Sequence, residues 1–561
     1  MIRSVLRPLR MQHPLGGKGA LVSSALTMAV GLAAVALGCG SDGAAPDASF
    51  DAGALFDGAP LDARTTDSST KGDAADGSTG CAAGQTTCAG ACVDTQSNPA
   101  NCGRCTKTCD VGLTCAAGEC HAPLQTVWEK HFGSPDLGNN IDSVALDALG
   151  NVYLAGYFSG SADLGGGALT SAGASDVLVA SLSPTGVHRW SKRFGGAGAD
   201  QGAGIAVSAG GKVYVTGNFR DTAEFGGVPL VSAGADDAFL LVLDAATGAF
   251  GSARRFGGNG GDTGLGLGVD SSGNVTVGGF FYSPNGALDF GGGSTTGVAG
   301  VNAFVASFDA GGQYRWSRAM GGPGSSCQDL TVDPNGNVAA VGEFQGTTDF
   351  GAGSVTSAGD FDAFVASYTS SGVPRFSHRF GASQADEAQS VSTDAAGNVL
   401  VGGSFGGSFH ASVNFGVGAP LVNIGASDGF VVRFDASGTA NLVRQLSPVS
   451  ASGNIVVRGV GFDGTGNIVA AGHLEGAANL GTGALAPLGT VDMFVAGFTP
   501  AGATRYARRL GGTGLDQAFG LAVASGGAMV VSGYFSNTAD VGKGPIAGAV
   551  KNGVVLLIAP P

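Results

Sequence analysis

One short stretch decides the fold: Asp147-Ala-Leu-Gly150-Asn151-Val-Tyr-Leu-Ala-Gly156. Asp side chains accept hydrogen bonds from nearby backbone, and Gly and Asn tolerate positive φ, so the first half is a turn. Apolar residues alternate before the turn and continue after it, which predicts a β-hairpin. The turn recurs as Asp270-Ser-Ser-Gly273-Asn274, Asp333-Pro-Asn-Gly336-Asn337, Asp394-Ala-Ala-Gly397-Asn398 and Asp463-Gly-Thr-Gly466-Asn467, with Ser208 and Ala524 replacing the Asp in two further copies.

Two more strands follow each hairpin. A third strand reads like Asp237-Ala-Phe-Leu-Leu-Val, and a fourth like His188-Arg-Trp-Ser-Lys-Arg-Phe194. A large apolar residue closes each fourth strand, and these residues lie between 60 and 66 positions apart: Phe132, Phe194, Phe256, Met320, Phe380, Leu446 and Leu510. Four short strands in a regular repeat of this length form one blade of a β-propeller.

The two ends of the repeat region complement each other. The last unit stops after its third strand, at 553–558, and a lone fourth strand at 128–132 precedes the first unit. Pairing the two strands completes a blade and removes exposed sheet edges. The sequence therefore predicts an all-β fold over 125–561, a seven-bladed propeller that an N-terminal strand closes.

These motifs resemble the seven-bladed β-propeller repeat family, or SBBP repeats. The resemblance rests on the Asp-x-x-Gly-Asn-Val turn, on Asp-Phe-Gly segments such as the one at Asp349, on the Asp-Ala-Phe-Val strand at Asp362, and on Trp-Ser-x-x-Phe-Gly-Gly at Trp190. It covers about 125–561. It implies a fold and a surface location rather than a reaction.

The N-terminus has the layout of a bacterial export signal. Basic residues precede an apolar run over 20–38, and small residues lead up to Cys39, as in a lipoprotein signal. We expect 1–38 to be a signal peptide and Cys39 to carry lipid. The alternatives for the apolar run are an ordinary signal peptide and an uncleaved membrane anchor. The Asp-, Ala- and Gly-rich segment 39–80 is expected to be a disordered tether. The protein is then an exported, membrane-anchored lipoprotein of the outer membrane or cell surface, or of the periplasm.

Cysteine is concentrated in the segment 81–120. An even number in a short exported segment predicts four disulfides, which so small a module needs for stability. Cys102-x2-Cys105 also has zinc-ligand spacing, but the segment contains no His before His121, and we expect no metal. Cys327 stands alone among the repeats and is expected to be a buried apolar residue. The eight clustered residues are Cys81, Cys88, Cys92, Cys102, Cys105, Cys109, Cys115 and Cys120.

Catalytic signatures are missing from the sequence. The net charge of −15 argues against nucleic-acid binding. No nucleophile elbow occurs in a strand-turn-helix setting, and the turn Asp residues carry too few oxygen neighbours for a calcium loop. The acids at Asp236/Asp237 and Asp360/Asp362 recur at one blade position, which favours a structural role. We expect no catalytic residues and no cofactor.

A basic residue stands two positions before the end of each fourth strand. Because this strand is the outermost in a propeller, the charge either discourages pairing between molecules or forms a rim for an anionic envelope polymer. Six of these residues are Lys130, Lys192, Arg254, Arg318, Arg444 and Arg508, and His378 holds the seventh position. The repeat breaks at 280–286 and 405–413, where aromatic residues either bind a ligand or pack a loop.

Together these features predict a non-enzymatic binding or scaffold lipoprotein of the cell envelope. Its partner is an unknown protein or an envelope glycan. The alternative is a propeller enzyme that acts on extracellular polysaccharide, and acids or histidines gathered at one mouth of the ring would favour it.

Overall fold

The computed structural model describes residues 124–560 apart from 134–137, 285–286, 321, 323, 407–410 and 549–550. Before them it describes 81, 85–95, 98, 100–109, 114–116 and 119–121. The predicted signal peptide 1–38, Cys39 and the tether 39–80 lie outside these residues. Every regular element in the described part is a strand. It contains no helix that is long and apolar enough to cross a membrane.

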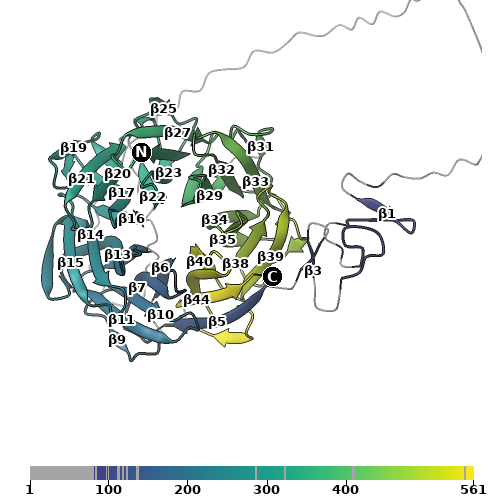
Figure 1. Ribbon diagram of the computed structural model, residues 1–561, viewed down its shortest axis with the longest axis horizontal. Coiled ribbons are helices and arrows are strands. Elements are labelled where there is room, and N and C mark those ends of the chain that lie inside the picture. Colours follow the sequence, from purple (N-terminus) through teal and green to yellow (C-terminus); the bar gives the residue numbers. More distant parts are fainter. Residues whose placement is uncertain are drawn as a thin grey trace, which may run out of the picture. The chain divides into compact units, whose positions relative to one another are not determined.

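The repeat region is a β-propeller (Figure 1). Within the described residues, its main strands pair into seven four-stranded antiparallel sheets. Six of the sheets follow the chain order from the innermost to the outermost strand, and the seventh takes its outermost strand from the start of the repeat region. The strands of the first four sheets are β6 (Asn140–Leu146), β7 (Val152–Phe158), β10 (Asp176–Leu182) and β11 (His188–Gly196); β12 (Gln201–Val207), β13 (Lys212–Phe225), β14 (Val228–Asp244) and β15 (Phe250–Phe256); β16 (Asp262–Val269), β17 (Val275–Ser283), β20 (Gly300–Phe308) and β21 (Tyr314–Met320); β22 (Ser326–Val332), β23 (Val338–Phe344), β26 (Asp362–Tyr368) and β27 (Pro374–Phe380).

The remaining three sheets repeat this arrangement. Their strands are β28 (Glu387–Thr393), β29 (Val399–Gly406), β32 (Ser427–Phe434) and β33 (Ala440–Pro448); β34 (Asn454–Phe462), β35 (Ile468–Glu475), β38 (Asp492–Phe498) and β39 (Thr504–Gly512); β40 (Gln517–Val523), β41 (Met529–Phe535), β44 (Asn552–Ala559) and β5 (Gln125–Phe132). Small hairpins leave most of the sheets between the second and third strands: β8 (Ser161–Ala162) with β9 (Leu169–Thr170), β18 (Ala287–Asp289) with β19 (Ser294–Thr296), β24 (Thr347–Asp349) with β25 (Ser354–Thr356), β30 (Ser412–Val413) with β31 (Leu421–Val422), β36 (Ala478–Asn479) with β37 (Ala484–Leu485), and β42 (Thr538–Asp540) with β43 (Pro545–Ala547).

The lone N-terminal strand closes the ring. β5 pairs antiparallel with β44, from Phe132 opposite Gly553 to Gln125 opposite Ala559. The innermost strands of neighbouring sheets are also in contact all round the ring, and β40 meets β6. The predicted closing strand is therefore confirmed.

Buried aromatic pairs explain the recurring Asp-Phe-Gly segment. Its Phe packs against the Phe of the third strand in the same sheet, and the ring centroids of Phe350 and Phe364 lie 4.3 Å apart. Aromatic pairs at such distances stabilise a core beyond the effect of burial alone. The other pairs are Phe225 with Phe239, Phe290 with Phe304, and Phe415 with Phe430, each 4.8 Å apart.

The repeated Asp residues close the inner hairpins. Asp147 Oδ1 accepts hydrogen bonds from the backbone N–H groups of Leu149 and Asn151, and Oδ2 accepts one from Asn151 Nδ2. The same three bonds form at Asp270, Asp333, Asp394 and Asp463. Because the carboxylates accept these bonds from the turn itself, the hairpin interpretation is confirmed.

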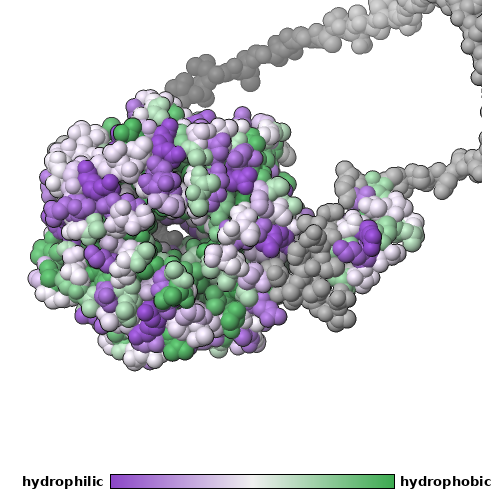
Figure 2. All heavy atoms as spheres, in the orientation of Figure 1, coloured by the Kyte–Doolittle hydropathy of each residue, from purple (hydrophilic) through white to green (hydrophobic). Residues whose placement is uncertain are grey.

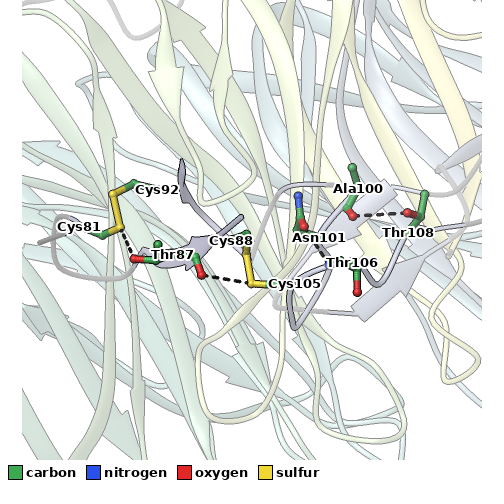
Figure 3. Close-up of a disulfide and its surroundings, with 9 residues drawn as sticks. All are labelled: Cys81, Thr87, Cys88, Cys92, Ala100, Asn101, Cys105, Thr106 and Thr108. Carbon is green, nitrogen blue, oxygen red and sulfur yellow. Dashed lines mark hydrogen bonds between the residues drawn. A yellow bond between two sulfur atoms is a disulfide. The ribbon is translucent and has the colours of Figure 1, made fainter. Parts of the chain in front are cut away.

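The Cys-rich module contains disulfides (Figure 3). Its strands are β1 (Thr86–Cys88), β2 (Ala91–Val93), β3 (Thr114–Ala116) and β4 (Glu119–His121). Cys109 is disulfide-bonded as well, and the side chain of Cys120 lies outside the described part. Sulfurs of Cys102, Cys109 and Cys115 lie within 4.8 Å of one another, but disulfide sulfurs are not the thiolates that zinc requires. Three bonds have both partners described: Cys81–Cys92, Cys88–Cys105 and Cys102–Cys115.

Candidate functional site

Every innermost strand carries a β-bulge near its start. In each sheet the pairing of the first and second strands skips one residue of the first strand. A bulge re-aims a side chain and is frequent beside active sites. The innermost strands surround the central opening (Figure 1). The skipped residues, which we call the bulge ring, are Asp142, Ala203, Leu265, Gln328, Gln389, Arg458 and Phe519.

A second ring lies at the same end of the channel. A glycine recurs in each second strand, as Gly533 does in β41, and the residue after it pairs with the first strand close to its bulge, as Tyr534 does with Gln517. We call these residues the facing ring, and the two rings with Glu387, Gln517 and Lys551 the polar mouth. The facing ring consists of Tyr157, Asn218, Phe280, Glu343, Ser404, His473 and Tyr534.

Side chains of the bulge ring touch across neighbouring sheets. Gln389 Nε2 donates to Glu387 Oε2 at 2.5 Å, and Gln389 Oε1 accepts from Arg458 Nη1. The Arg458 guanidinium carbon lies 5.9 Å from the ring centroid of Phe519. Arg458 therefore connects the fifth, sixth and seventh sheets at the channel.

These contacts continue into the first sheet. The rings of Phe519 and Tyr534 lie 5.8 Å apart, and Tyr534 Oη donates to Gln517 Oε1 at 3.1 Å. Lys551 Nζ lies 4.2 Å from the ring centroid of Tyr534 and donates to Tyr157 Oη at 3.2 Å. A cation this close to a ring face is attracted to it. Polar and aromatic groups thus line the mouth from the fifth sheet to the first.

The fourth and first sheets add acids. Glu343 Oε1 accepts from Gln328 Nε2 at 3.4 Å, and Asp142 Oδ1 accepts from Asn140 Nδ2 at 2.7 Å. In the second and third sheets the bulge positions hold Ala203 and Leu265 instead. The mouth therefore has a long polar side and a short apolar side.

Arg458 is the most constrained group of the polar mouth. Burial lowers the pKa of its guanidinium, while Glu387 and Glu343 act in the opposite direction. Among the described residues its Nε atom has no hydrogen-bond partner. The Nε atom is buried, whereas Arg458 as a whole is half-buried, so only the rest of its side chain is open to an acceptor group of a ligand.

At the other end of four innermost strands, β6, β12, β16 and β22, the lining is mostly apolar. A hollow of about 240 Å³ lies among the ends of the innermost strands, with Leu146, Val207, Val269 and Val332 in its wall. The opening at the centre of the ring is visible in the space-filling view (Figure 2). At the ends of β6, β12, β16 and β22 the lining is thus mostly apolar, in contrast to the polar mouth.

The predicted basic rim lies on the outermost strands, where its side chains pack against the next sheet. The guanidinium carbon of Arg254 lies 5.4 Å from the ring centroid of Phe308. Arg318 Nε donates to the Gly372 carbonyl at 2.8 Å. The remaining ring contacts of this kind are Arg318 over Tyr368 and Arg444 over Phe498, and His378 stacks on Phe434.

The other members of the rim are similarly placed. Arg508 Nη1 donates to the Leu124 carbonyl at 2.8 Å, and burial lowers the pKa of both Arg508 and Arg444. Lys192 is half-buried near Gly248 of the next sheet. Lys130 borders a hollow of about 250 Å³ beside Asp163. This placement supports a structural role for the rim residues between sheets.

The other candidates are dispersed. His131 contacts Glu129 in the seventh sheet, and His188 contacts Ser191 in the first. His378 lies in the fourth sheet. Cys327 is fully buried, as expected, and burial raises the pKa of its thiol. Where the repeat breaks, Phe281 and Phe405 are buried and Tyr282 is 45% exposed, while 285–286 and 407–410 lie outside the described residues.

The sequence analysis missed the polar mouth. Aligning the repeats on the terminal Gly of the second strand would have found the facing ring, because the next residue is Tyr157, Glu343 or His473 in different copies. The bulge ring gives no such signal, since a bulge has no fixed residue.

Comparisons with known proteins reach two parts of the chain. The profile of the "Stigma-specific STIG1-like protein family" matches residues 65–123. No curated protein matches at a significant level. Among solved structures, the Dos1 propeller is 12% identical with a TM-score of 0.37, covering 78% of this chain and 95% of its own. The Pan2 WD40 domain of Neurospora crassa is 9% identical (TM-score 0.37; 75% and 89% covered). The quinohemoprotein alcohol dehydrogenase ADHIIG of Pseudomonas putida HK5 is 13% identical (TM-score 0.35; 78% and 76% covered). Likenesses this distant carry nothing about function.

Proposed function

We propose that the protein is a non-enzymatic binding module of the cell envelope that takes its ligand at the polar mouth. The bulge ring carries this proposal. One backbone position recurs in seven described sheets, yet its residues are acidic, amide, basic, aliphatic and aromatic. Folding alone needs no such variety, whereas recognition of an asymmetric ligand does.

The chemistry of the mouth fits a glycan best. Sugars present hydroxyl groups that both donate and accept, together with apolar C–H faces. Gln389 and Gln517 offer amide groups of both kinds, Glu387 accepts, and Tyr534 and Phe519 offer rings. Charges of both signs are present, so a neutral or weakly charged envelope glycan matches better than a strongly anionic polymer.

An exported location agrees with this role. Disulfides persist in oxidising compartments, and the module before the propeller contains several. We extend the proposal to an anchor at lipidated Cys39 and to membership of the SBBP repeat group, on the sequence features given above. The propeller would then be held at the outer membrane or cell surface, or in the periplasm.

The test is retention of envelope polysaccharide fractions on the immobilised chain. We expect a glycan to be retained by the unchanged chain and lost with Arg458→Ala. The matched control is Arg254→Ala, which removes an arginine that also lies over an aromatic ring, but on an outermost strand. Loss with both variants would contradict the site. If a protein is retained instead of a glycan, the polar mouth remains the proposed site and the proposed ligand becomes a protein.

One observation favours a second function, a propeller enzyme that cleaves extracellular polysaccharide. Asp142, Glu343 and Glu387 all lie at the polar mouth, and glycoside hydrolysis needs two carboxyl groups. Binding remains the better supported function because a glutamine amide engages each glutamate. Release of new sugar ends by the unchanged chain, abolished by Glu343→Gln or Glu387→Gln, would establish the enzyme.

A further inference from the structure

Pairs of buried carboxyl groups lie at four junctions between neighbouring sheets. One aspartate of each pair lies on a third strand, and the other precedes the first strand of the next sheet or begins it. All eight side chains are at most 1% exposed. The pairs are Asp176 with Asp200, Asp237 with Asp262, Asp362 with Asp386, and Asp492 with Asp516.

Three of the four oxygens in each pair have donors. In the first pair, Asp200 accepts from the backbone N–H groups of Gly196 and Arg220, one on each oxygen. Asp176 Oδ2 accepts from Ala172 N–H and from Arg193 Nη1, whereas its Oδ1 has no partner among the described residues. The other three pairs repeat this pattern, with Oδ1 of Asp237, Asp362 and Asp492 unpartnered and with Arg255, Arg379 and Arg509 as the cations.

The unpartnered oxygen faces the second acid. A methyl group added to Gly511 would lie 2.7 Å from Asp492 Oδ1 and 2.7 Å from Asp516 Oδ2, so one glycine covers both atoms. A methyl group added to Gly195 would likewise meet both Asp176 Oδ1 and Asp200 Oδ2. Two neighbouring buried carboxyl groups can both be ionised only at a large cost.

At two of the other three junctions neutral groups replace the pair, and the third keeps a single acid. At the third sheet the two positions hold Asn302 and Ser325, and Ser325 Oγ accepts from Ala303 N–H at 2.9 Å. At the seventh they hold Asn552 and Asn139. The fifth sheet keeps only Asp428, and Gln445 Nε2 donates to it in place of an arginine.

These replacements follow a charge rule. Each sheet with an aspartate pair has an arginine at one position of its outermost strand. In the three sheets without a pair, the same position holds Ala319, His131 or Gln445. One arginine neutralises one carboxylate, so an aspartate pair is neutral only if its second acid is protonated. The amides and hydroxyl of the neutral junctions then occupy the place of a protonated acid.

We propose that each of the four pairs holds one proton, shared between Oδ1 of the strand aspartate and the facing oxygen of the junction aspartate, so that the propeller is more stable in mildly acidic than in alkaline medium. The charged groups facing the pairs are the four arginines and, at the first pair, Asp236 with its partner Arg220. Breaking the shared hydrogen bond leaves two charges buried between adjacent sheets, which loosens the ring at those junctions.

The titration of the junction acids agrees with this geometry. Burial, followed by the neighbouring aspartate, raises the pKa of Asp200 and Asp262 to about 6 and of Asp386 and Asp516 to about 7. The ordinary value is 3.8. Because the folded pKa lies above the unfolded one, the added stability is complete below the unfolded pKa and is lost as the pH rises through the folded pKa.

The experiment follows thermal unfolding of the full chain by circular dichroism between pH 5 and 8.5. We expect Tm to fall with rising pH, by about 5 °C or more. The variant Asp200→Asn/Asp262→Asn/Asp386→Asn/Asp516→Asn should remove most of this slope and should melt higher than the unchanged chain at pH 8. If it fails to fold, Asp516→Asn alone should remove part of the slope. Asp428→Asn, at a junction with a single acid, is the control and should keep the slope.

Two results would overturn the proposal. One is a Tm slope that the fourfold and single variants share with the unchanged chain. The other is an increase in Tm at pH 8 on addition of calcium or sodium that the variants do not show, because the pairs would then hold a cation instead of a proton.

Discussion

The outermost and innermost strands of the propeller use the same repeat in opposite ways. On the outermost strands one position is basic or a histidine throughout, and its side chain packs against the next sheet, as Arg254 does over Phe308. On the innermost strands one backbone position recurs at the bulge, but its residue changes from Asp142 to Arg458 to Phe519. A residue type that recurs at the same position in every sheet supports the architecture. A position that recurs in every sheet but holds different residue types indicates a role in recognition.

The largest effect is expected from removing the closing strand. Deleting residues 125–133 removes β5, leaves β44 paired on one side only, with β41, and opens the ring. We expect Tm to fall by more than about 10 °C, or folding to be lost. Thermal unfolding by circular dichroism measures this. An unchanged melt would show that the ring holds without β5.

The next largest effect is a loss of glycan affinity, which we expect from a substitution on an innermost strand but not on an outermost strand. Arg458→Ala removes the group that links three sheets at the polar mouth. We expect the dissociation constant for the retained glycan to rise by about tenfold or more, as for a central anchor in an interface. Fluorescence titration measures it, with the secondary structure checked by circular dichroism. Unaltered affinity in a folded variant would remove the polar mouth as the site.

A smaller effect is expected on the outermost strands. Arg254→Ala removes a cation that packs over Phe308 of the next sheet. We expect the free energy of unfolding to fall by about 1 kcal/mol through lost packing and cation–π attraction, and glycan affinity to stay unchanged. Denaturant unfolding and the same titration measure the two quantities. A weaker affinity without loss of stability would instead support an anionic rim.

The smallest effect is expected at an exposed aromatic residue where the repeat breaks. Tyr282 is 45% exposed and belongs to neither ring. Tyr282→Ala should change the free energy of unfolding by less than about 0.5 kcal/mol and should not alter glycan affinity. A clear loss of affinity would move the site from the polar mouth to this loop.

The sequence predicts the architecture well because the architecture repeats. The Asp147 turn and the Phe350 segment each appear in several copies, so chance resemblance is excluded and their roles in hairpin and core follow from their chemistry. The complementary ends also predict the closure by β5. Even the location of the basic residues on the outermost strands was predictable.

The sequence does not predict what the polar mouth or the junctions contain. Gln389, Arg458 and Phe519 lie more than sixty positions apart along the chain and meet only because the ring brings three bulges together. Asp176 and Asp200 look like separate turn residues, and only their shared burial shows that they face each other. Contacts between neighbouring sheets form only in the closed ring, so a pattern in a short stretch of sequence cannot predict them.

Hydrogen–deuterium exchange with and without the retained glycan tests the central claim most directly. If the polar mouth binds it, protection should appear at the starts of β28, β34 and β40 and at the end of β41, around Gln389, Arg458 and Tyr534. Protection confined to the outermost strands β15, β21 and β39 would contradict the account, because the ligand would then lie on the basic rim.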